Sequence, residues 1–261
     1  MILLVFLICL SASTLGGICG IGGGVIIKPI LDATGIMSVS TLSFLSGLTV
    51  LAMAVVNVWK NRRNRAMDIH RSLPLGIGAA AGGLLGKELF QLLKASVAFD
   101  GMVLFVQSLL LGLLMIGTLL YTLNKSRIRT HQLQNSLLCV LAGLGLGMLS
   151  AFLGIGGGPM NLIVLFFLFS MDTKQAAINS LLIILLSQLT SFGMTLLSHK
   201  VPEFDWALLI AMAGAGILGG FLSAELRKKM SIKKTDQLFS GLLVVIILIC
   251  FYNAIRSILP I

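Results

Sequence analysis

Charged residues are scarce in this sequence, and acidic residues are the scarcest. Asp and Glu account for only 9 of the 261 residues, and all charged residues together make up 11%. Soluble domains carry about 25% charged residues, so a soluble globular fold with a hydrated exterior is excluded. Hydrophobic residues make up 57% of the chain, and the mean hydropathy is +1.04. Lipid is therefore expected to surround much of the protein.

Motifs for metals and nucleotides are also missing. The four cysteines form no CxxC pair and have no metal-site spacing. No Gly-Lys-Ser/Thr follows the glycine runs, so the chain has no phosphate loop. We therefore expect no cofactor, no bound metal and no ATP hydrolysis by this chain.

Long apolar runs dominate the sequence and approach or exceed the roughly 20 residues that a membrane-spanning helix needs. They lack the alternating pattern of a membrane β-barrel. The predicted fold is an all-α polytopic membrane protein. Two further apolar segments, 1–34 and 135–171, are interrupted by glycine and proline. The predicted spans are 39–59, 72–93, 98–123, 175–197, 205–225 and 236–255.

Basic residues cluster in short connections between these spans, which is typical of cytoplasmic loops. The net charge of +10 therefore indicates membrane topology, and we expect no nucleic-acid partner. Contact with anionic membrane lipid is a secondary interpretation of the first cluster. The clusters are Lys60, Arg62, Arg63, Arg65 and Arg71; Lys125, Arg127 and Arg129; and Arg227, Lys228, Lys229, Lys233 and Lys234.

The chain contains an internal duplication. The sequence Gly-Ile-Gly-Gly-Gly at 20–24 recurs at 154–158. The shift in numbering that carries the first run onto the second, the repeat offset, also aligns two Gly-xxx-Gly pairs without a gap. The sequence thus predicts a first transmembrane repeat at 1–127, a cytoplasmic joint at 128–134 and a second transmembrane repeat at 135–261.

Loop charges predict that the two repeats are inverted relative to one another. Equivalent loops carry opposite charge bias in the two copies, as expected if the copies face opposite ways. Each repeat must then cross the membrane an odd number of times. Three spans per repeat are clear, so the glycine segment should be a re-entrant or broken helix. Parallel repeats of four crossings, or a complete first crossing by residues 1–19, are the alternatives.

The two glycine tips are the predicted binding site. Each is followed by a short apolar segment that can form a half-helix, whose free N–H groups and positive dipole end would face the tip. Two such tips meeting near the midplane would form an anion site. The alternative is that the glycines allow close helix packing, which we favour for Gly78, Gly82, Gly83, Gly86, Gly216 and Gly220. The predicted substrate-binding residues are Gly22, Gly23, Gly24, Lys28, Ser46, Gly156, Gly157, Gly158, Asn179 and Ser180.

The polar members of this set each have a second interpretation. Lys28 lies one turn beyond the first tip, where its ammonium could attract an anion or extend to the membrane surface. The hydroxyls of Ser46 and Ser180 could donate to an oxyanion or bond to their own helices. Asn179 adds two amide donors.

The paired glycine motif, Pro29, and the later segments Asn179-Ser180-Leu181 and Phe204-Asp205-Trp206 resemble the TauE/SafE family of sulfite exporters. The resemblance covers nearly the whole chain. It implies movement of sulfite or a related organosulfur anion across the bacterial cytoplasmic membrane by a multi-pass protein. The chain differs from the family pattern at Asn179, at Lys28 and at Ile163, where proline is expected.

The predicted function is a secondary transporter of a small anion that works by alternating access, as a monomer or a homo-oligomer. A passive anion channel is the nearest alternative. An intramembrane hydrolase is the alternative from another class, but the best serine context, around Ser46, has no histidine at membrane depth. We therefore expect no enzyme activity.

Overall fold

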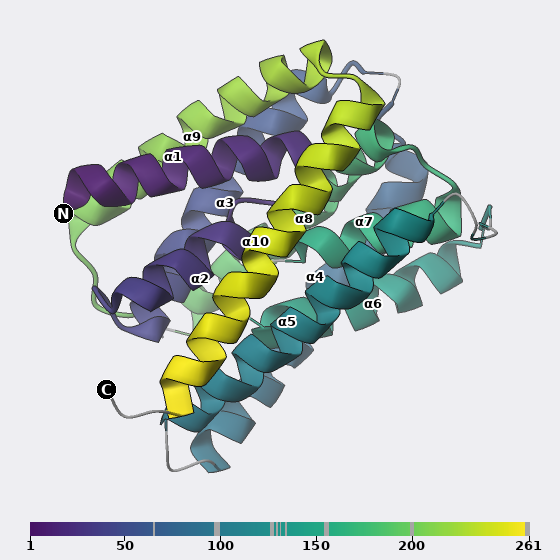
Figure 1. Ribbon diagram of the computed structural model, residues 1–261. Coiled ribbons are helices and arrows are strands. Elements are labelled where there is room, and N and C mark those ends of the chain that lie inside the picture. The colour runs from purple at the N-terminus through teal and green to yellow at the C-terminus, as the bar shows by residue number, and fades with distance from the viewer. Residues whose placement is uncertain are drawn as a thin grey trace.

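The described residues of the chain form a bundle of ten helices and contain no strand (Figure 1). The structure is a computed structural model that describes residues 1–64, 66–96, 100–125, 128, 130, 132–133, 135–153, 157–198 and 201–258. The helices are α1 (Ile2–Cys19), α2 (Gly24–Thr34), α3 (Val39–Asn61), α4 (Ile69–Ser96), α5 (Asp100–Asn124), α6 (Ser136–Leu153), α7 (Gly158–Phe169), α8 (Thr173–Leu197), α9 (Trp206–Lys229) and α10 (Ile232–Ile258). All six predicted spans and both predicted half-helices are confirmed as helices.

Local sequence explains where several long helices begin. Ser38 caps α3 by accepting a hydrogen bond from the Thr41 N–H, and Asp205 caps α9 by accepting one from the Ala207 N–H. Asp172 and Gln175 form a capping box at the start of α8. Such caps satisfy N–H groups that have no partner within the helix. These helix starts are therefore encoded by polar residues in the connecting loops.

The helix boundaries recur at the repeat offset. The first five helices map in order onto the second five, and the bounds of α1 shift to those of α6 without a change in length. Contacts are exchanged in the same way: α1 packs on α9 as α6 packs on α4, and α3 packs on α9 as α8 packs on α4. Exchanged contacts of this kind indicate an approximate two-fold relation between the two sets of five helices. The inverted orientation in the membrane stays a prediction.

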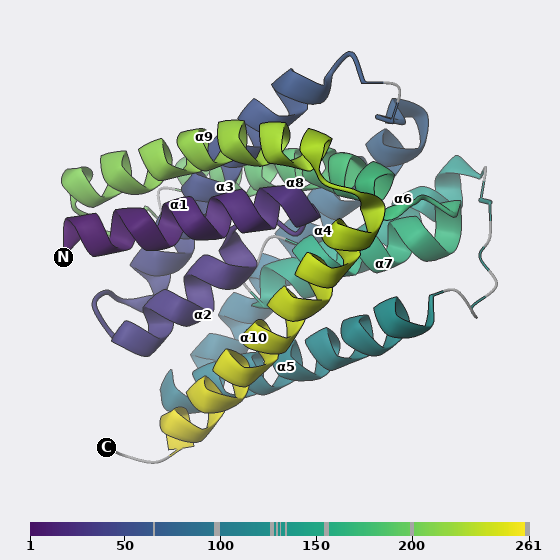
Figure 2. The same cartoon turned by 45° about the horizontal axis from the view of Figure 1, so that its top comes forward.

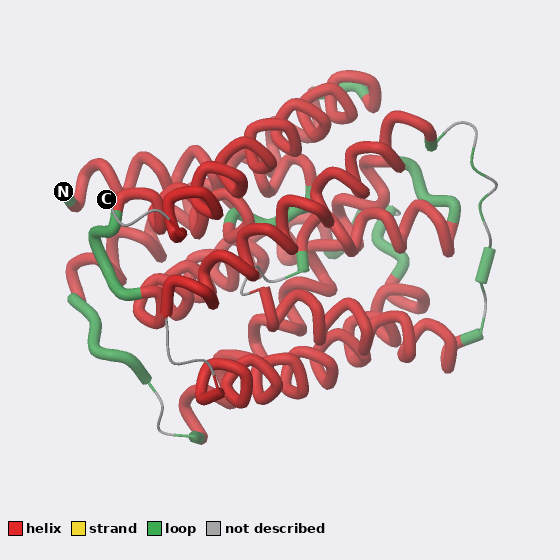
Figure 3. Tube along the Cα trace, turned by 60° about the horizontal axis from the view of Figure 1, so that its bottom comes forward, coloured by secondary structure: helices red, strands yellow, loops and turns green. Residues whose placement is uncertain are grey.

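Side-chain contacts place the three basic clusters at one end of the bundle. Lys60 at the end of α3 pairs with Glu225 of α9 (Nζ–Oε1 2.6 Å). Lys125 at the end of α5 pairs with Asp236 at the start of α10 (Nζ–Oδ1 2.7 Å). At the other end of the bundle, Arg256 of α10 bonds to the Ala33 carbonyl of α2. The tube view shows the connecting loops gathered at the two ends (Figure 3). A common basic end is what the inverted-repeat prediction requires.

Glycines bring α4 and α6 into close backbone contact. A Cβ added to Gly78, Gly82 or Gly86 would overlap a carbonyl oxygen of α6, and one added to Gly143 or Gly147 would overlap a carbonyl oxygen of α4. Gly216 and Gly220 lie similarly close to the backbone of α3. The packing interpretation of these glycines is therefore confirmed. For Gly83 a Cβ would make only an ordinary contact, with Ser187.

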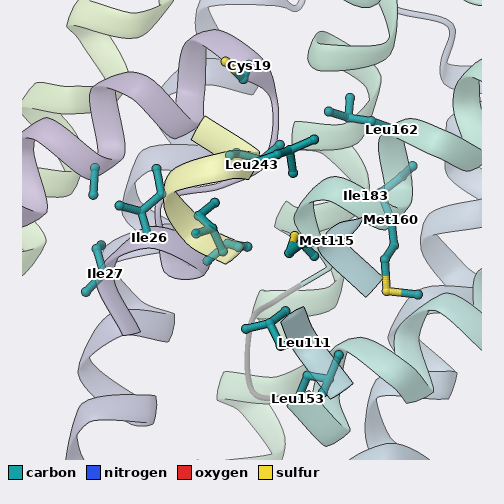
Figure 4. Packing of buried hydrophobic residues seen from close by; sticks show 14 of the residues in the cluster. Cys19, Ile26, Ile27, Leu111, Met115, Leu153, Met160, Leu162, Ile183 and Leu243 are labelled. Atoms are coloured by element: carbon teal, nitrogen blue, oxygen red, sulfur yellow. The ribbon is translucent and has the colours of Figure 1, made fainter. Parts of the chain in front are cut away.

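The bundle interior is apolar, and so is its outer surface. Buried side chains from all ten described helices belong to one core, and Figure 4 shows part of it. Large hydrophobic side chains also cover the outside, for example Ile210 (70% exposed) and Leu248 (65% exposed). Among the described residues, seven helices are long and apolar enough to cross a membrane: α1, α3, α5, α6, α8, α9 and α10. An apolar exterior of this extent requires lipid as its solvent.

Candidate anion site at the glycine tips

Both glycine segments interrupt the helical path, as predicted. In the first, Gly20 ends α1 with φ +77° and Gly22 adopts φ +72°, so the chain turns back into the 11-residue helix α2. Figures 1 and 2 show α2 doubling back beneath α1. Residues with a side chain rarely adopt positive φ, whereas glycine does so without strain. In the second segment Gly157, with φ +96°, precedes α7.

The two tips lie against one another. The Gly158 backbone, at the first turn of α7, packs so closely on the Ile21 carbonyl that a Cβ at Gly158 would overlap it. The same Cβ would lie 3.0 Å from Val25 in the first turn of α2. Gly20 packs with similar closeness on the backbone of Ala177 in α8. Chain breaks from the two halves of the sequence therefore form one buried structure at the centre of the bundle.

The N-termini of α2 and α7 are buried and carry no side-chain cap. The N-cap residues are Gly23 and Gly157, and neither helix start receives a side-chain hydrogen bond. Helices α3, α8 and α9 of the same protein all receive one. A buried helix start without a cap leaves N–H groups that need a partner. These groups and the positive dipole ends favour an anion.

Two serine hydroxyls near the first tip are buried without a hydrogen-bond partner. Ser13 of α1 is fully buried, and a Cβ on Gly23 would lie 3.1 Å from its Oγ. Ser180 is also fully buried, on the face of α8 between Ala177 and Ile184, the residues that pack against Gly20 and Gly22. A buried hydroxyl without a partner is destabilising. Among the described residues only the Tyr121 hydroxyl shares this condition.

The second tip has its own polar lining. A Cβ on Gly157 would lie 3.1 Å from the amide nitrogen of Asn161 and 3.3 Å from the Ser150 hydroxyl. Both side chains are buried. Gly157 is the counterpart of Gly23 at the repeat offset, so a serine of the preceding helix lies beside the same glycine in each copy. The predicted site residue Gly156 lies outside the described residues.

A buried cation lies at the end of the helix that leads into each tip. Lys28 of α2 is 5% exposed and donates to the Leu153 carbonyl, the last of α6 (3.3 Å). Arg227 of α9 is 3% exposed and donates to the Gly17 carbonyl in the last turn of α1 (2.9 Å). Cations stabilise the negative end of a helix dipole. Lys28 and Arg227 therefore offset the negative C-terminal ends of the α6 and α1 dipoles. The positive N-terminal ends of α2 and α7 lie at the tips, and no anionic side chain offsets them within the contacts described above.

Arg227 corrects one part of the sequence interpretation. We assigned it to a basic loop, whereas the structure places it inside α9 with its guanidinium buried. It also donates to the Asn57 side-chain oxygen (2.9 Å), and the Asn57 amide donates to the Gly220 carbonyl. A buried charge is costly unless hydrogen bonds replace its lost hydration, and these two acceptors supply part of that replacement. Arg227 therefore joins α1, α3 and α9 rather than marking a loop.

The structure gives two other predicted site residues local roles. The Ser46 hydroxyl donates to the Ser43 carbonyl within its own helix (3.3 Å). The Asn179 amide donates to the carbonyls of Ala66 and Gln175, and its oxygen accepts from Asp68 and Ser72. Asn179 thus holds the start of α4 against α8. Its donors are already engaged, so we do not retain it as a substrate contact.

Asn179→Ala is expected to destabilise the protein by about 1–3 kcal/mol, because it removes the acceptor of the buried Ser72 hydroxyl and of the part-buried Asp68 N–H. The midpoint of thermal unfolding in detergent should fall, while the apparent KM for transport of the folded fraction stays unchanged. The exposed Ser198→Ala is the control and should leave both unchanged. An unchanged unfolding midpoint with a raised KM would instead assign Asn179 to substrate binding.

Three residues of this site were missed by the sequence interpretation: Ser13, Ser150 and Asn161. A signal was present, because each is one of the few polar residues in a predominantly apolar helix next to a glycine tip. The repeat offset did not reveal them, since the counterpart of Ser13 is Gly147 and that of Ser150 is Gly16. Comparing the copies position by position therefore hid a feature that both tips share in space.

Comparison with known proteins identifies relatives of this chain. Residues 5–249 match the family model described as sulfite exporter TauE/SafE. The chain is also similar to the probable membrane transporter protein YunE of Bacillus subtilis (strain 168), at 27% identity over 95% of this chain and 96% of that protein. No solved structure matches the chain.

The family match covers almost the full length, and the resemblance noted from the glycine motifs is confirmed. With seven apolar helices long enough to span, the chain is a multi-pass membrane protein. It belongs to the sulfite exporter TauE/SafE family.

Proposed function

We propose that this protein is a secondary transporter that moves a small anion, sulfite or a related organosulfur oxyanion, across the membrane by alternating access. The family and the name of the Bacillus relative support membrane transport. The family description supports a sulfur oxyanion as the substrate. The site at the tips supports an anion independently of either name.

One observation carries the proposal: two buried, uncapped helix N-termini meet beside two unpartnered serine hydroxyls. An oxyanion has several acceptor atoms and a negative charge, so it can accept from N–H and O–H groups together. Binding it would satisfy the Ser13 and Ser180 hydroxyls, whose burial is otherwise destabilising. An anion is therefore the ligand class that best fits the unused hydrogen-bonding groups.

The surroundings of the tips make a cationic substrate unfavourable. Lys28 and Arg227 are buried close to the tips, and two positive helix ends meet there. A cation at that point would be repelled by all four, with little water to screen the interaction. The same arrangement stabilises a monovalent or divalent anion.

Gly23→Ala tests the site by adding one methyl group at the first tip. Gly23 has φ −67°, which alanine adopts readily, but the new methyl group would lie 3.1 Å from both the Cα and the hydroxyl of Ser13 and 3.3 Å from Ile27. Losing one or two hydrogen bonds to a charged ligand is worth about 1.5–3 kcal/mol each. We expect sulfite uptake into proteoliposomes to fall by about tenfold or more.

Gly145→Ala in α6 is the matched control, because a Cβ there meets nothing within 4 Å. It should transport sulfite at the wild-type rate. The larger Gly23→Leu should abolish uptake. Wild-type uptake in both Gly23 variants, with normal folding, would rule out the tips as the site. Electrical currents far larger than the turnover rate of a carrier allows would show that the protein is an anion channel and does not work by alternating access.

A further inference from the structure

A polar crevice lies beside the tips, between α2, α5 and α10. It is narrow, with a cavity volume of roughly 20 Å³, and reaches the end of α6. Three of its lining residues with amide or hydroxyl side chains come from helices other than α2: Gln107 and Ser108 from α5, and Asn253 from α10. Lys28 and Asp32 of α2 complete the polar lining. Polar side chains inside a membrane protein are costly and commonly mark the path of a substrate.

The polar lining of the crevice is not repeated at the equivalent positions given by the repeat offset, so the fold itself does not require it. The repeat offset assigns each lining residue a counterpart, and none of the counterparts is charged or carries an amide or hydroxyl side chain. In the order Lys28, Pro29, Asp32, Gln107, Ser108, Leu111, Leu153, Cys250 and Asn253, they are Leu162, Ile163, Phe166, Gly241, Leu242, Val245, Cys19, Ile116 and Leu119. The same architecture therefore accepts an apolar lining at this position.

Lys28 links the crevice to the second tip. Its ammonium bonds to the Leu153 carbonyl, and the Gln107 amide bonds to the Phe152 carbonyl (2.7 Å). The Lys28 ammonium has three donors, of which the Leu153 carbonyl uses one. Within the described residues it forms no salt bridge. It can therefore keep its helix contact and still donate to a ligand in the crevice.

The charged groups around the crevice add up to a net positive charge. Helix α2 contributes Lys28 and the half-buried Asp32. Helix α10 contributes the buried Cys250 thiol and, in its last turn, the exposed Arg256. Arg256 bonds to the carbonyl of Ala33, next to Asp32. Neither Gln107 nor Ser108 of α5 can titrate. Two cations against one carboxylate favour entry of an anion. The Asn253 amide donates to the Pro29 carbonyl and holds α10 against α2 (3.1 Å).

We propose that this crevice is a second anion-binding station, where the transported oxyanion contacts Lys28 before or after it occupies the tips. The proposal rests on the transport function proposed above. The crevice lies toward the end of the bundle opposite the basic clusters, where Arg256 contacts α2. Asp32, on the same face of α2 as Lys28, opposes the anion and keeps the station from binding it too tightly.

The local charge can be measured without transport. Ser108 is buried in the wall of the crevice and can be replaced by cysteine in a Cys250→Ala background. We expect Ser108→Cys to react faster with anionic methanethiosulfonate ethylsulfonate than with its cationic trimethylammonium analogue. Adding Lys28→Met should lower the anionic-to-cationic rate ratio by about tenfold or more. Adding Asp32→Asn should raise it. Methanesulfonate should protect the thiol only when Lys28 is present.

Leu242→Cys, at the counterpart of Ser108 in the second repeat, is the control and should show neither a charge preference that depends on Lys28 nor protection. Equal rates for both reagents at Ser108→Cys, or a ratio unaffected by Lys28→Met, would overturn the proposal. The outcome is separable from the transport function. If labelling follows the prediction but the protein takes up no sulfite, the second station is supported and the transport function is contradicted. If Lys28→Met takes up sulfite at the wild-type rate and Ser108→Cys shows no charge preference, the station is contradicted and the transport function is supported.

Discussion

Replacing Gly158 by alanine should prevent the protein from folding. The added methyl group would overlap the Ile21 carbonyl and press on Val25, and these atoms belong to the tightly turned backbone of the first tip and the helix turn that follows it. Overpacking of a core usually costs about 1–3 kcal/mol, because side chains can adjust. Here the opposing atom is a main-chain oxygen, so the cost should exceed that range. Size-exclusion chromatography in mild detergent should show little monodisperse protein.

The control for this variant again comes from α6, where Gly145→Ala places the same methyl group in open space. It should elute as the wild type does and keep the wild-type unfolding midpoint. A monodisperse Gly158→Ala protein with an unchanged midpoint would show that the tips do not touch as the structure describes. That result would also remove the basis for a shared anion site.

The second large effect is expected for Arg227→Met. The guanidinium donates to the Gly17 carbonyl and to the Asn57 side-chain oxygen, both buried, and after its removal only the long contact with the Ser223 hydroxyl (3.5 Å) remains at Asn57. A hydrogen bond to a charged group contributes about 1.5–3 kcal/mol, and two such bonds are lost. The yield of folded protein and the unfolding midpoint should both fall sharply. Lys229→Met, two residues further along α9 and exposed, should have almost no effect.

A double variant separates the loss of Arg227 from general damage to α9. Arg227→Met combined with Asn57→Leu removes both polar partners, so part of the lost stability should return. Additive losses in the double variant, or a near-wild-type Arg227→Met protein, would contradict the network. Arg227→Lys should rescue only partly, because an ammonium lacks the planar fork that reaches two acceptors.

Much of the fold could be predicted from the sequence because the bilayer leaves few alternatives. Backbone groups in lipid must bond within helices, so apolar length alone located α3, α5 and α8. Glycine runs located the breaks, since Gly20, Gly22 and Gly157 adopt φ values that side chains resist. The half-helices then followed from the apolar residues after each break. These features depend on local sequence only.

The parts that could not be predicted depend on contacts between distant segments. Arg227 carries the same charge as its neighbours in sequence, and only the packing of α9 on α1 shows that it is buried. Ser13 reaches the first tip because the chain reverses at Gly20–Gly23. Asn179 has a donor-rich amide, but the start of α4 occupies it. In each case the residue type indicated a polar contact, but the sequence did not reveal which distant residue makes it.

The pairing of α1 with α9 and of α6 with α4 has a consequence for biogenesis. When α1 leaves the ribosome, the helix that covers its glycines and Ser13 has not yet been synthesised, because α9 begins only at Trp206. Until α9 is inserted, the first hairpin must wait in the bilayer, where the Gly17 carbonyl lacks the guanidinium that later binds it. Quality-control proteases and insertion chaperones would therefore encounter an unfinished first half in every molecule made, and neither half of the gene expressed alone should yield a stable product.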